Sequence, residues 1–213
     1  MHLHWFGHSC FQMTFSNGTR VLCDPFDDHV GYPVPAVETD IVTCSHDHFD
    51  HGFTQVLKGE FTEIRGAGHY EFGGVEIDGI ESFHDEDQGA KRGKNTIFRY
   101  RADGLTIVHL GDLGHFPTPE QLEFISGADI LLCPIGGFYT IDTDFALLTV
   151  SMAKPKTVIA MHFKTAVNDF PISDEKKFAK ALEAQYIPTS DLDVTADTVS
   201  ALPYAIIMDY PKA

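Results

Sequence analysis

The chain is poor in basic residues, with 15 Lys and Arg against 31 Asp and Glu and a formal net charge of −16. A field of this sign repels nucleic-acid phosphates and anionic membrane surfaces, so neither is expected as a partner. A small anionic molecule is less affected, because bound divalent cations can dominate the charge of a local pocket. The composition therefore favours a small-molecule substrate over a polymer.

Paired cysteines are also lacking. The four cysteines are dispersed, none belongs to a C-x-x-C pair, and each lies in or beside an apolar run: Cys10, Cys23, Cys44 and Cys133. We expect these thiols to be buried and free, as in a reducing compartment. The first residues lack the basic start and long apolar stretch of a signal peptide, and no apolar run approaches transmembrane length. The resulting prediction is a cytoplasmic protein.

The chain does have enough apolar residues to bury one sizeable core, since they make up 43% of its 213 residues. It has no low-complexity tract and no long linker, so we expect residues 1–213 to form one domain. Turn signals at Asn17-Gly18 and Asp103-Gly104 predict two β-hairpins. Strands are expected at 3–6, 10–15, 19–23, 41–44, 62–65, 75–83, 95–101, 105–110, 129–133, 157–161 and 205–208. Helices are expected to begin within 53–58 and to cover 119–125, 142–152 and 173–184, with Ser173 capping the last.

Four side chains that readily bind metal fall within six consecutive residues, directly after the short buried strand 41–44: His46, His48, Asp50 and His51. In extended backbone His46 and His48 point to the same side, because side chains alternate with period two. Imidazole and carboxylate ligands suit zinc, iron or manganese. The alternative is a solvated loop in a chain with 12 His. Such a loop has no reason to show this spacing after a buried strand, so we prefer two adjacent metals with two ligands each.

Further candidates share a position in the predicted strand pattern. His46, His84, Asp112 and His162 each fall just beyond the C-terminal end of a separate predicted strand. Strand ends are rigid platforms from which side chains can converge on a metal. The candidate ligands are therefore His46, His48, Asp50, His51, His84, Asp112 and His162.

Three other histidines compete with His84 for its role. His109 lies inside a predicted strand and is expected to be packed, whereas His69 follows a glycine turn and ends no apolar run. His115 is near enough to Asp112 to orient a ligand or to contact substrate. His84 remains the preferred ligand on its strand-end position.

The order of these motifs resembles that of the metallo-β-lactamase superfamily. The residues that carry the resemblance are H-x-H-x-D-H at 46–51, then His84, Gly111-Asp112 and His162, with Asp24 at the first motif. Its small single-domain branch, which includes ascorbate-phosphate lactonase-like proteins, is resembled by Gly7-His8-Ser9, Asp24-Pro25-Phe26, residues 109–115, residues 134–137 and residues 161–164.

This resemblance implies an α/β fold, a four-layer αβ/βα sandwich of two mixed β-sheets flanked by helices, with a dinuclear site at one edge. It implies that His46, His48 and His84 hold one metal, that Asp50, His51 and His162 hold the other, and that Asp112 bridges them. Asp24 would support the site without binding metal. The two ions are expected to be Zn²⁺, with Mn²⁺ or Fe²⁺ as alternatives. Asp112 and the missing signal peptide point away from antibiotic hydrolysis, and the lack of an added nucleic-acid domain points away from nucleases.

The leading hypothesis is a metal-dependent hydrolase that acts on a small ester, lactone or phosphoester. Two divalent ions would lower the pKa of a shared water and generate a bridging hydroxide. Asp50 is the candidate catalytic residue, which would orient the nucleophile and relay its proton. His8, Asn95 and Lys164 are candidates for substrate contact. Specificity is expected in the loops 27–35, 85–94 and 138–140.

Two other classes of function are compatible with the same ligands. A non-haem iron redox protein could use this fold, because histidines with carboxylates also suit iron. No nearby cysteine or second electron-carrier domain supports that role. The second alternative is a non-catalytic binding module stabilised by metal, which the intact set of ligands disfavours. Self-association into a homo-oligomer is left open.

Overall fold

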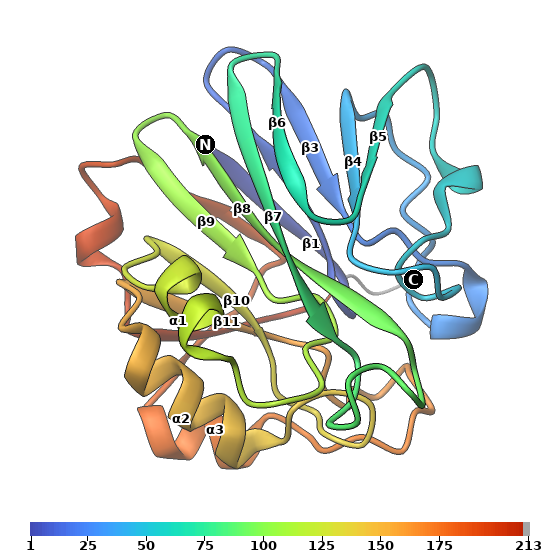
Figure 1. The fold of residues 1–213 in the computed structure, drawn as a ribbon. Helices are drawn as coiled ribbons and strands as arrows, with labels where there is room; N and C mark the ends of the chain where they lie inside the picture. Colours follow the sequence, from blue (N-terminus) through green and yellow to red (C-terminus); the bar gives the residue numbers. More distant parts are fainter. Residues whose placement is uncertain (211–213) are drawn as a thin grey trace.

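The computed structural model describes residues 1–210, which contain two β-sheets facing each other (Figure 1). The strands of the first sheet, in spatial order, are β13 (Asp191–Asp193), β1 (His2–Gly7), β2 (Cys10–Thr14), β3 (Arg20–Cys23), β4 (Ile41–Cys44) and β5 (Thr62–Arg65). Those of the second sheet are β12 (Gln185–Ile187), β14 (Ala205–Met208), β11 (Thr157–Met161), β10 (Ile130–Pro134), β9 (Leu105–His109), β8 (Lys94–Ala102), β7 (Val75–Phe83) and β6 (Gly68–Phe72).

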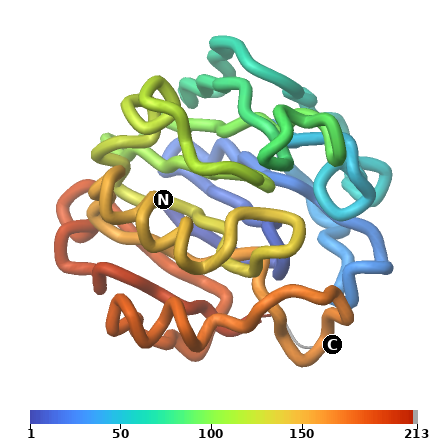
Figure 2. Tube along the Cα trace, turned by 60° about the horizontal axis from the view of Figure 1, so that its bottom comes forward, coloured from blue at the N-terminus to red at the C-terminus, as the bar shows by residue number. Residues whose placement is uncertain are grey.

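Within residues 1–210, three α-helices accompany the second sheet: α1 (Pro119–Ile125), α2 (Thr143–Ala153) and α3 (Lys176–Leu182). Helix α1 contacts β7, and α3 contacts β14. Figures 1 and 2 both show α2 and α3 (yellow to orange) beside the C-terminal strands and away from the β4–β5 edge (cyan). Three short 3₁₀ turns complete the elements of the described part of the chain: η1 (Asp28–Val30), η2 (Thr54–Val56) and η3 (Val199–Ala201).

Both sheets are mixed. In the first, β1, β2 and β3 pair antiparallel, while β3, β4 and β5 pair parallel. In the second, β6 to β9 pair antiparallel, while β9, β10, β11 and β14 pair parallel. The predicted α/β sandwich of two mixed sheets with helices is therefore confirmed.

The inner faces of the two sheets share one apolar core. On β1, Leu3 and Trp5 are buried while His2 and His4 are half-buried on the other face, as the two-residue period of a strand requires. Leu3 and Trp5 pack in one cluster with apolar side chains of the second sheet such as Ile97 and Ile107. This shared core holds the strand ends of both sheets in fixed positions relative to each other.

The pairing directions bring several strand ends to one edge of the sandwich. Strands β1, β3 and β4 run in the same direction in the first sheet, and β7, β9, β10 and β11 do so in the second. The chain leaves each of these strands at the same end of its sheet. The loops that follow them are therefore the loops able to build a common site.

Two helix predictions differ from the structure. The segment 53–58 forms only the 3₁₀ turn η2, and α3 begins at Lys176 rather than at Ser173. Ser173 is not a cap, because its backbone N–H donates to the carbonyl of Gly136 and its carbonyl accepts from the N–H of Lys164. Tertiary bonds to neighbouring loops replace the first turn of the helix that the local pattern favoured.

The four cysteines are buried and free, as predicted. Burial raises the pKa of the Cys23 thiol to about 12, so this thiol stays protonated and unreactive near neutral pH. Within residues 1–210, no helix combines the length and the apolar character that crossing a bilayer requires.

Candidate metal centre

The first group of candidate ligands contains three histidines from two loops. His46 and His48 follow β4, and His84 follows β7 of the opposite sheet. Each offers a ring nitrogen, and these nitrogens lie within 4.8 Å of one another. The ring centroids of His46 and His84 are 4.7 Å apart, and those of His46 and His48 are 4.5 Å apart. Three imidazoles so arranged could hold one metal ion.

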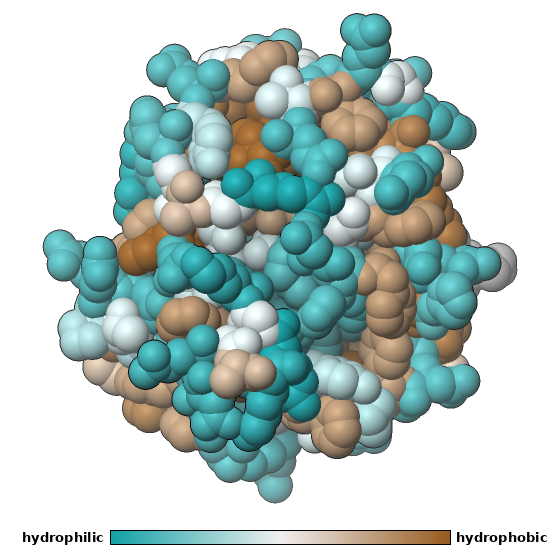
Figure 3. Space-filling view, turned by 45° about the vertical axis from the view of Figure 1, so that its right-hand side comes forward, coloured by the Kyte–Doolittle hydropathy of each residue, from teal (hydrophilic) through white to brown (hydrophobic). Residues whose placement is uncertain are grey.

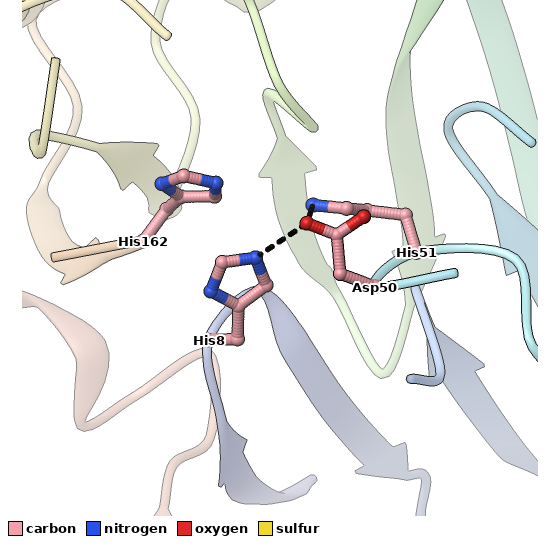
Figure 4. Close-up of side chains that lie close together, drawn as sticks. All are labelled: His8, Asp50, His51 and His162. Atoms are coloured by element: carbon pink, nitrogen blue, oxygen red, sulfur yellow. Dashed lines mark hydrogen bonds and ion pairs between the residues drawn. The ribbon is translucent and has the colours of Figure 1, made fainter. Parts of the chain in front are cut away.

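The second group contains His8, Asp50, His51 and His162, whose ligand atoms also lie within 4.8 Å of one another (Figure 4). His8 follows β1, His162 follows β11, and the other two come from the loop after β4. His8 Nε2 lies 3.3 Å from Asp50 Oδ2, and His51 Nε2 lies 3.8 Å from the same oxygen. This group is more buried than the first, with Asp50 as its most exposed member.

Asp112 lies between the two groups. Its Oδ1 is 3.1 Å from His51 Nε2, and its Oδ2 is 3.3 Å from His84 Nε2 and 3.3 Å from His162 Nε2. One carboxylate therefore faces ligand atoms of both groups, and it is itself 1% exposed. A carboxylate with two oxygens in this position could join two metal ions.

The nitrogen and oxygen atoms of these side chains could ligate a metal, because most of them are buried and make no hydrogen bond. A buried polar atom without a partner is costly, and metal coordination removes that cost. The atoms concerned are His46 Nε2, Asp50 Oδ1, His51 Nε2, His84 Nδ1, Asp112 Oδ1 and both ring nitrogens of His162. Of these, His51 Nε2 and His162 Nε2 lie within ion-pair distance of the Asp112 carboxylate but make no hydrogen bond of good geometry with it.

Asp24 orients the ring of His51 from the side away from the other candidate ligands. Its Oδ2 accepts a hydrogen bond from His51 Nδ1 at 2.7 Å, which leaves Nε2 of that ring facing the site. The same carboxylate accepts from the backbone N–H of Ser45 at 2.8 Å and from the Ser45 hydroxyl at 2.6 Å. A carboxylate behind a ligating histidine fixes the ring and makes it a stronger ligand.

Gly111 allows the close packing that places Asp112. A Cβ added at Gly111 would lie 2.3 Å from Asn95 Oδ1 and 2.6 Å from Ser45 Cβ, and its φ of +54° lies in the left-handed region. The amide oxygen of Asn95 accepts from the Asp112 backbone N–H at 2.9 Å. Its Nδ2 donates to Ser82 Oγ and to the carbonyl of Leu110. Asn95 is thus used to position backbone, and its side chain is buried.

The histidines and carboxylates of the two groups shift one another's pKa values. Burial would lower the pKa of His51, but Asp112, Asp50 and Asp24 beside it raise that pKa well above its ordinary value. Burial would raise the pKa of Asp112, but His162, His51 and His84 hold it well below its usual range. Burial lowers the pKa of His46. These directions favour a protonated His51 beside ionised Asp112, Asp50 and Asp24.

Metal binding is expected to release a proton from His51. The raised pKa of His51 stabilises the metal-free fold fully below the ordinary histidine pKa, and this contribution is lost as pH rises through the raised value. A metal must displace that proton, so its apparent affinity rises with pH. Calorimetry of zinc binding at pH 6, in buffers of different ionisation enthalpy, should show release of about one proton per chain or more. Release near zero would contradict this charge state.

The remaining sequence candidates lie in different surroundings. The His115 ring is bonded to backbone on both sides, since Nε2 accepts from the Phe83 N–H and Nδ1 faces the carbonyl of Phe116. Lys164 Nζ donates to the carbonyl of Phe170 at 3.1 Å, and Lys164 lines a separate cavity of about 530 Å³. His109 is buried, and its Nε2 is hydrogen-bonded to the carbonyl of Ser9. Neither His115 nor Lys164 joins the two ligand groups.

A cavity of about 420 Å³ reaches the candidate ligands from solvent. Arg92 and Tyr139 belong to the loops 85–94 and 138–140, in which the sequence predicts specificity. Phe49 and Phe170 were not candidates, because a loop sequence has no regular pattern that indicates where its side chains point. The lining residues are Asp47, His48, Phe49, Asp50, His84, Arg92, Asp112, Tyr139 and Phe170.

The two-sheet sandwich, with two groups of candidate metal ligands at one edge, is an arrangement shared with a known superfamily. Residues 2–162 match the family described as "Beta-lactamase superfamily domain". The chain therefore belongs to the metallo-β-lactamase superfamily, which confirms the resemblance seen in its motifs.

Within this superfamily the chain is similar to small proteins named metal-dependent hydrolases. A UPF0173 metal-dependent hydrolase of Methanoregula boonei is 33% identical over 189 residues, which cover 78% of this chain and 83% of the relative. A crystal structure from Thermotoga maritima, described as a candidate zinc-dependent hydrolase of the superfamily, has a TM-score of 0.83 at 34% identity and covers 99% of both chains. A metallo hydrolase from Ignicoccus hospitalis has a TM-score of 0.64 at 26% identity, over 85% of this chain and 90% of that one. The predicted small single-domain branch is thus confirmed.

Proposed function

We propose that this chain is a metal-dependent hydrolase with a dinuclear site, acting on a small ester, lactone or phosphoester. The observation that carries the proposal is the position of Asp112, a buried carboxylate that faces histidines of both ligand groups. The names of its relatives support hydrolysis as the reaction. The strongly acidic composition supports a small molecule over nucleic acid or a membrane as partner.

The ligands divide between two ions. His46, His48 and His84 would hold one, Asp50, His51 and His162 would hold the other, and Asp112 would contact both. Imidazole and carboxylate ligands favour Zn²⁺, with Mn²⁺ or Fe²⁺ as alternatives. Bound divalent ions supply Lewis acidity that activates water and polarises the substrate oxygen.

The chain's own residues position the reactants and move the proton. Asp24 holds His51 by its Nδ1, so that Nε2 stays directed at the site. Asp50 has Oδ2 near His8 and Oδ1 buried without a partner, and Oδ1 is our candidate to orient the attacking water and accept its proton. The water oxygen bonds to the carbonyl carbon or phosphorus, the bond to the leaving oxygen breaks, and the proton passes to that oxygen.

The volume of the cavity supports the proposal of a small substrate. Its volume of about 420 Å³ lies at the lower end of the range for sites that bind small molecules. Asp50, His84 and Asp112 line it, so a molecule inside it reaches both ligand groups.

The test is a panel of lactones, thioesters, carboxylic esters and phosphodiesters, assayed with metal-loaded protein and again after chelation. We expect turnover of at least one class, its loss on chelation, and its recovery when Zn²⁺, Mn²⁺ or Fe²⁺ is returned. Turnover that is indifferent to chelation and metal content would overturn the proposal. Optical spectra and elemental analysis of the same samples distinguish a zinc hydrolase from an iron redox protein.

A further inference from the structure

Arg92 is the one lysine or arginine among the described residues that line the substrate cavity. It shares that lining with Asp50, His84 and Asp112. It also borders two neighbouring hollows, one lined by His46 and His48 and the other by Phe138 and Tyr139. The residue is half-buried. A cation held at the wall of a small cavity, in a chain of net charge −16, calls for a specific explanation.

Arg92 differs from the other arginines in its partners. Every other arginine of the chain is paired with carboxylates: Arg20 with Glu38 and Asp40, Arg65 with Asp47 and Glu63, Arg99 with Asp78, and Arg101 with Glu76 and Asp78. Within residues 1–210, no carboxylate lies within ion-pair distance of the Arg92 guanidinium. Its five N–H donors are therefore free to bind an anion from solution.

The loop that carries Arg92 is held in shape by one buried carboxylate. Asp85 is 4% exposed, and its Oδ1 accepts the backbone N–H groups of Asp87 and Gly89. Its Oδ2 accepts those of Lys91 at 3.0 Å and Arg92 at 2.7 Å. The backbone of Arg92 is thus fixed by a charge-assisted bond, which places its side chain reproducibly at the cavity.

Aromatic rings orient the guanidinium and form an apolar wall beside it. The Arg92 guanidinium carbon lies 5.5 Å from the ring centroid of Tyr139 and 5.9 Å from that of Phe138. Tyr139, Phe49 and Phe170 also line the cavity. On the face shown in Figure 3, apolar side chains (brown) lie in separate areas among polar ones (teal).

We propose that Arg92 is an anion-binding residue that selects substrates carrying a carboxylate or phosphate at a distance from the bond that is cleaved. This proposal rests on the hydrolase function proposed above. The oxyanion would accept two parallel N–H bonds from the guanidinium, the apolar part of the substrate would lie on Tyr139, Phe49 and Phe170, and the scissile group would lie near Asp112. Arginine suits this task because its planar fork matches the geometry of carboxylate and phosphate.

The experiment compares two esters that differ only at the end remote from the scissile bond, mono-4-nitrophenyl adipate and 4-nitrophenyl hexanoate. We expect the wild-type, metal-loaded protein to prefer the anionic ester in kcat/KM. Arg92→Gln should lower that preference about tenfold or more, because a hydrogen-bonded charge pair is lost. Arg92→Lys should give an intermediate preference, since it keeps the charge but not the fork.

The matched control is Lys91→Gln, which removes the same charge one residue away. Lys91 is exposed and its ammonium is paired with Asp87, so the preference should stay within about twofold of wild type. An equal loss on both esters in Arg92→Gln would overturn the proposal, because Arg92 would then serve the reacting centre. An unchanged preference would overturn it as well.

A binding measurement separates this proposal from the hydrolase function. 5-Phenylvalerate has no hydrolysable bond, and 5-phenylpentanol is its neutral counterpart. Calorimetry with metal-loaded protein should show weaker binding of 5-phenylvalerate to Arg92→Gln by about tenfold, with little change for the alcohol. If wild type cleaves neither ester but this difference is found, the anion site stands and the hydrolase function on esters fails. Equal binding by wild type and variant overturns the anion site.

Discussion

Replacing Asp112 with alanine is expected to lower hydrolysis by on the order of 10³-fold or more and to remove most of the bound metal. Among residues 1–210, Asp112 is the one carboxylate that faces His51, His84 and His162 together. Without it, Asp50 is the one carboxylate left among the proposed ligands, and it would have to offset two divalent charges. The measurement is kcat/KM on the best substrate of the panel, together with elemental analysis of the same preparation.

Two controls make the Asp112 result interpretable. Asp197→Ala removes a carboxylate from an exposed loop and should change neither metal content nor kcat/KM beyond experimental error. Circular dichroism of Asp112→Ala should show the wild-type sheet content, since no backbone hydrogen bond uses this side chain among the described residues. Wild-type activity at wild-type metal content in Asp112→Ala would refute its bridging role.

Asp24→Ala should act on stability as well as on metal binding. The substitution leaves the Ser45 N–H, the Ser45 hydroxyl and His51 Nδ1 without their acceptor in a buried site. We expect the free energy of unfolding of the metal-free protein to fall by about 3 kcal/mol, the cost of breaking a buried charged network. Zinc affinity should fall roughly ten- to a hundredfold, because His51 loses the group that orients its ring. Urea denaturation and competition with a chelator measure the two effects.

The matched control for Asp24 is Asp40→Ala. Asp40 also accepts a backbone N–H and a guanidinium, both from Arg20, but at the half-exposed rim of the first sheet. Its loss should cost about 1 kcal/mol or less and leave zinc affinity unchanged. Equal effects of the two substitutions would show that Asp24 is an ordinary structural carboxylate rather than a support of the metal ligands.

The positions of the candidate ligands could be predicted because they depend on the direction of the strands. The expected strands at 41–44, 75–83, 105–110 and 157–161 correspond to β4, β7, β9 and β11, which end at the same edge. A short apolar run followed by His or Asp is visible in the sequence, and the core then brings those ends together. His8 follows the end of β1 in the same way, so its position after a strand also indicates that it lies at this edge of the sandwich.

The loops around the site could not be predicted, because tertiary bonds decide their shape. The turn from Asp85 to Arg92 is built on one carboxylate that accepts backbone N–H groups, and no periodicity marks it. The contact between Arg92 and the rings of Phe138 and Tyr139 joins segments far apart in the chain. Ser173 was wrongly expected to cap a helix for the same reason, since its backbone bonds to other loops.

Three short strands were not expected from the sequence. β6, β12 and β13 each lie at the edge of a sheet and contain mostly exposed or half-exposed residues. An edge strand with little burial lacks the alternation of apolar and polar residues that identifies a half-buried strand. Their pairing with β7, β14 and β1 comes from the completed sheets rather than from local pattern.

The most direct test of the dinuclear site is to locate and count the metal ions in the wild-type protein. The same result gives the reference for the metal content of Asp112→Ala. Crystals grown with zinc, measured on both sides of the zinc absorption edge, should show two anomalous peaks per chain. One peak should lie among His46, His48 and His84, the other among Asp50, His51 and His162, with Asp112 in contact with both. A single peak, or two peaks of which neither contacts Asp112, would contradict the proposed centre.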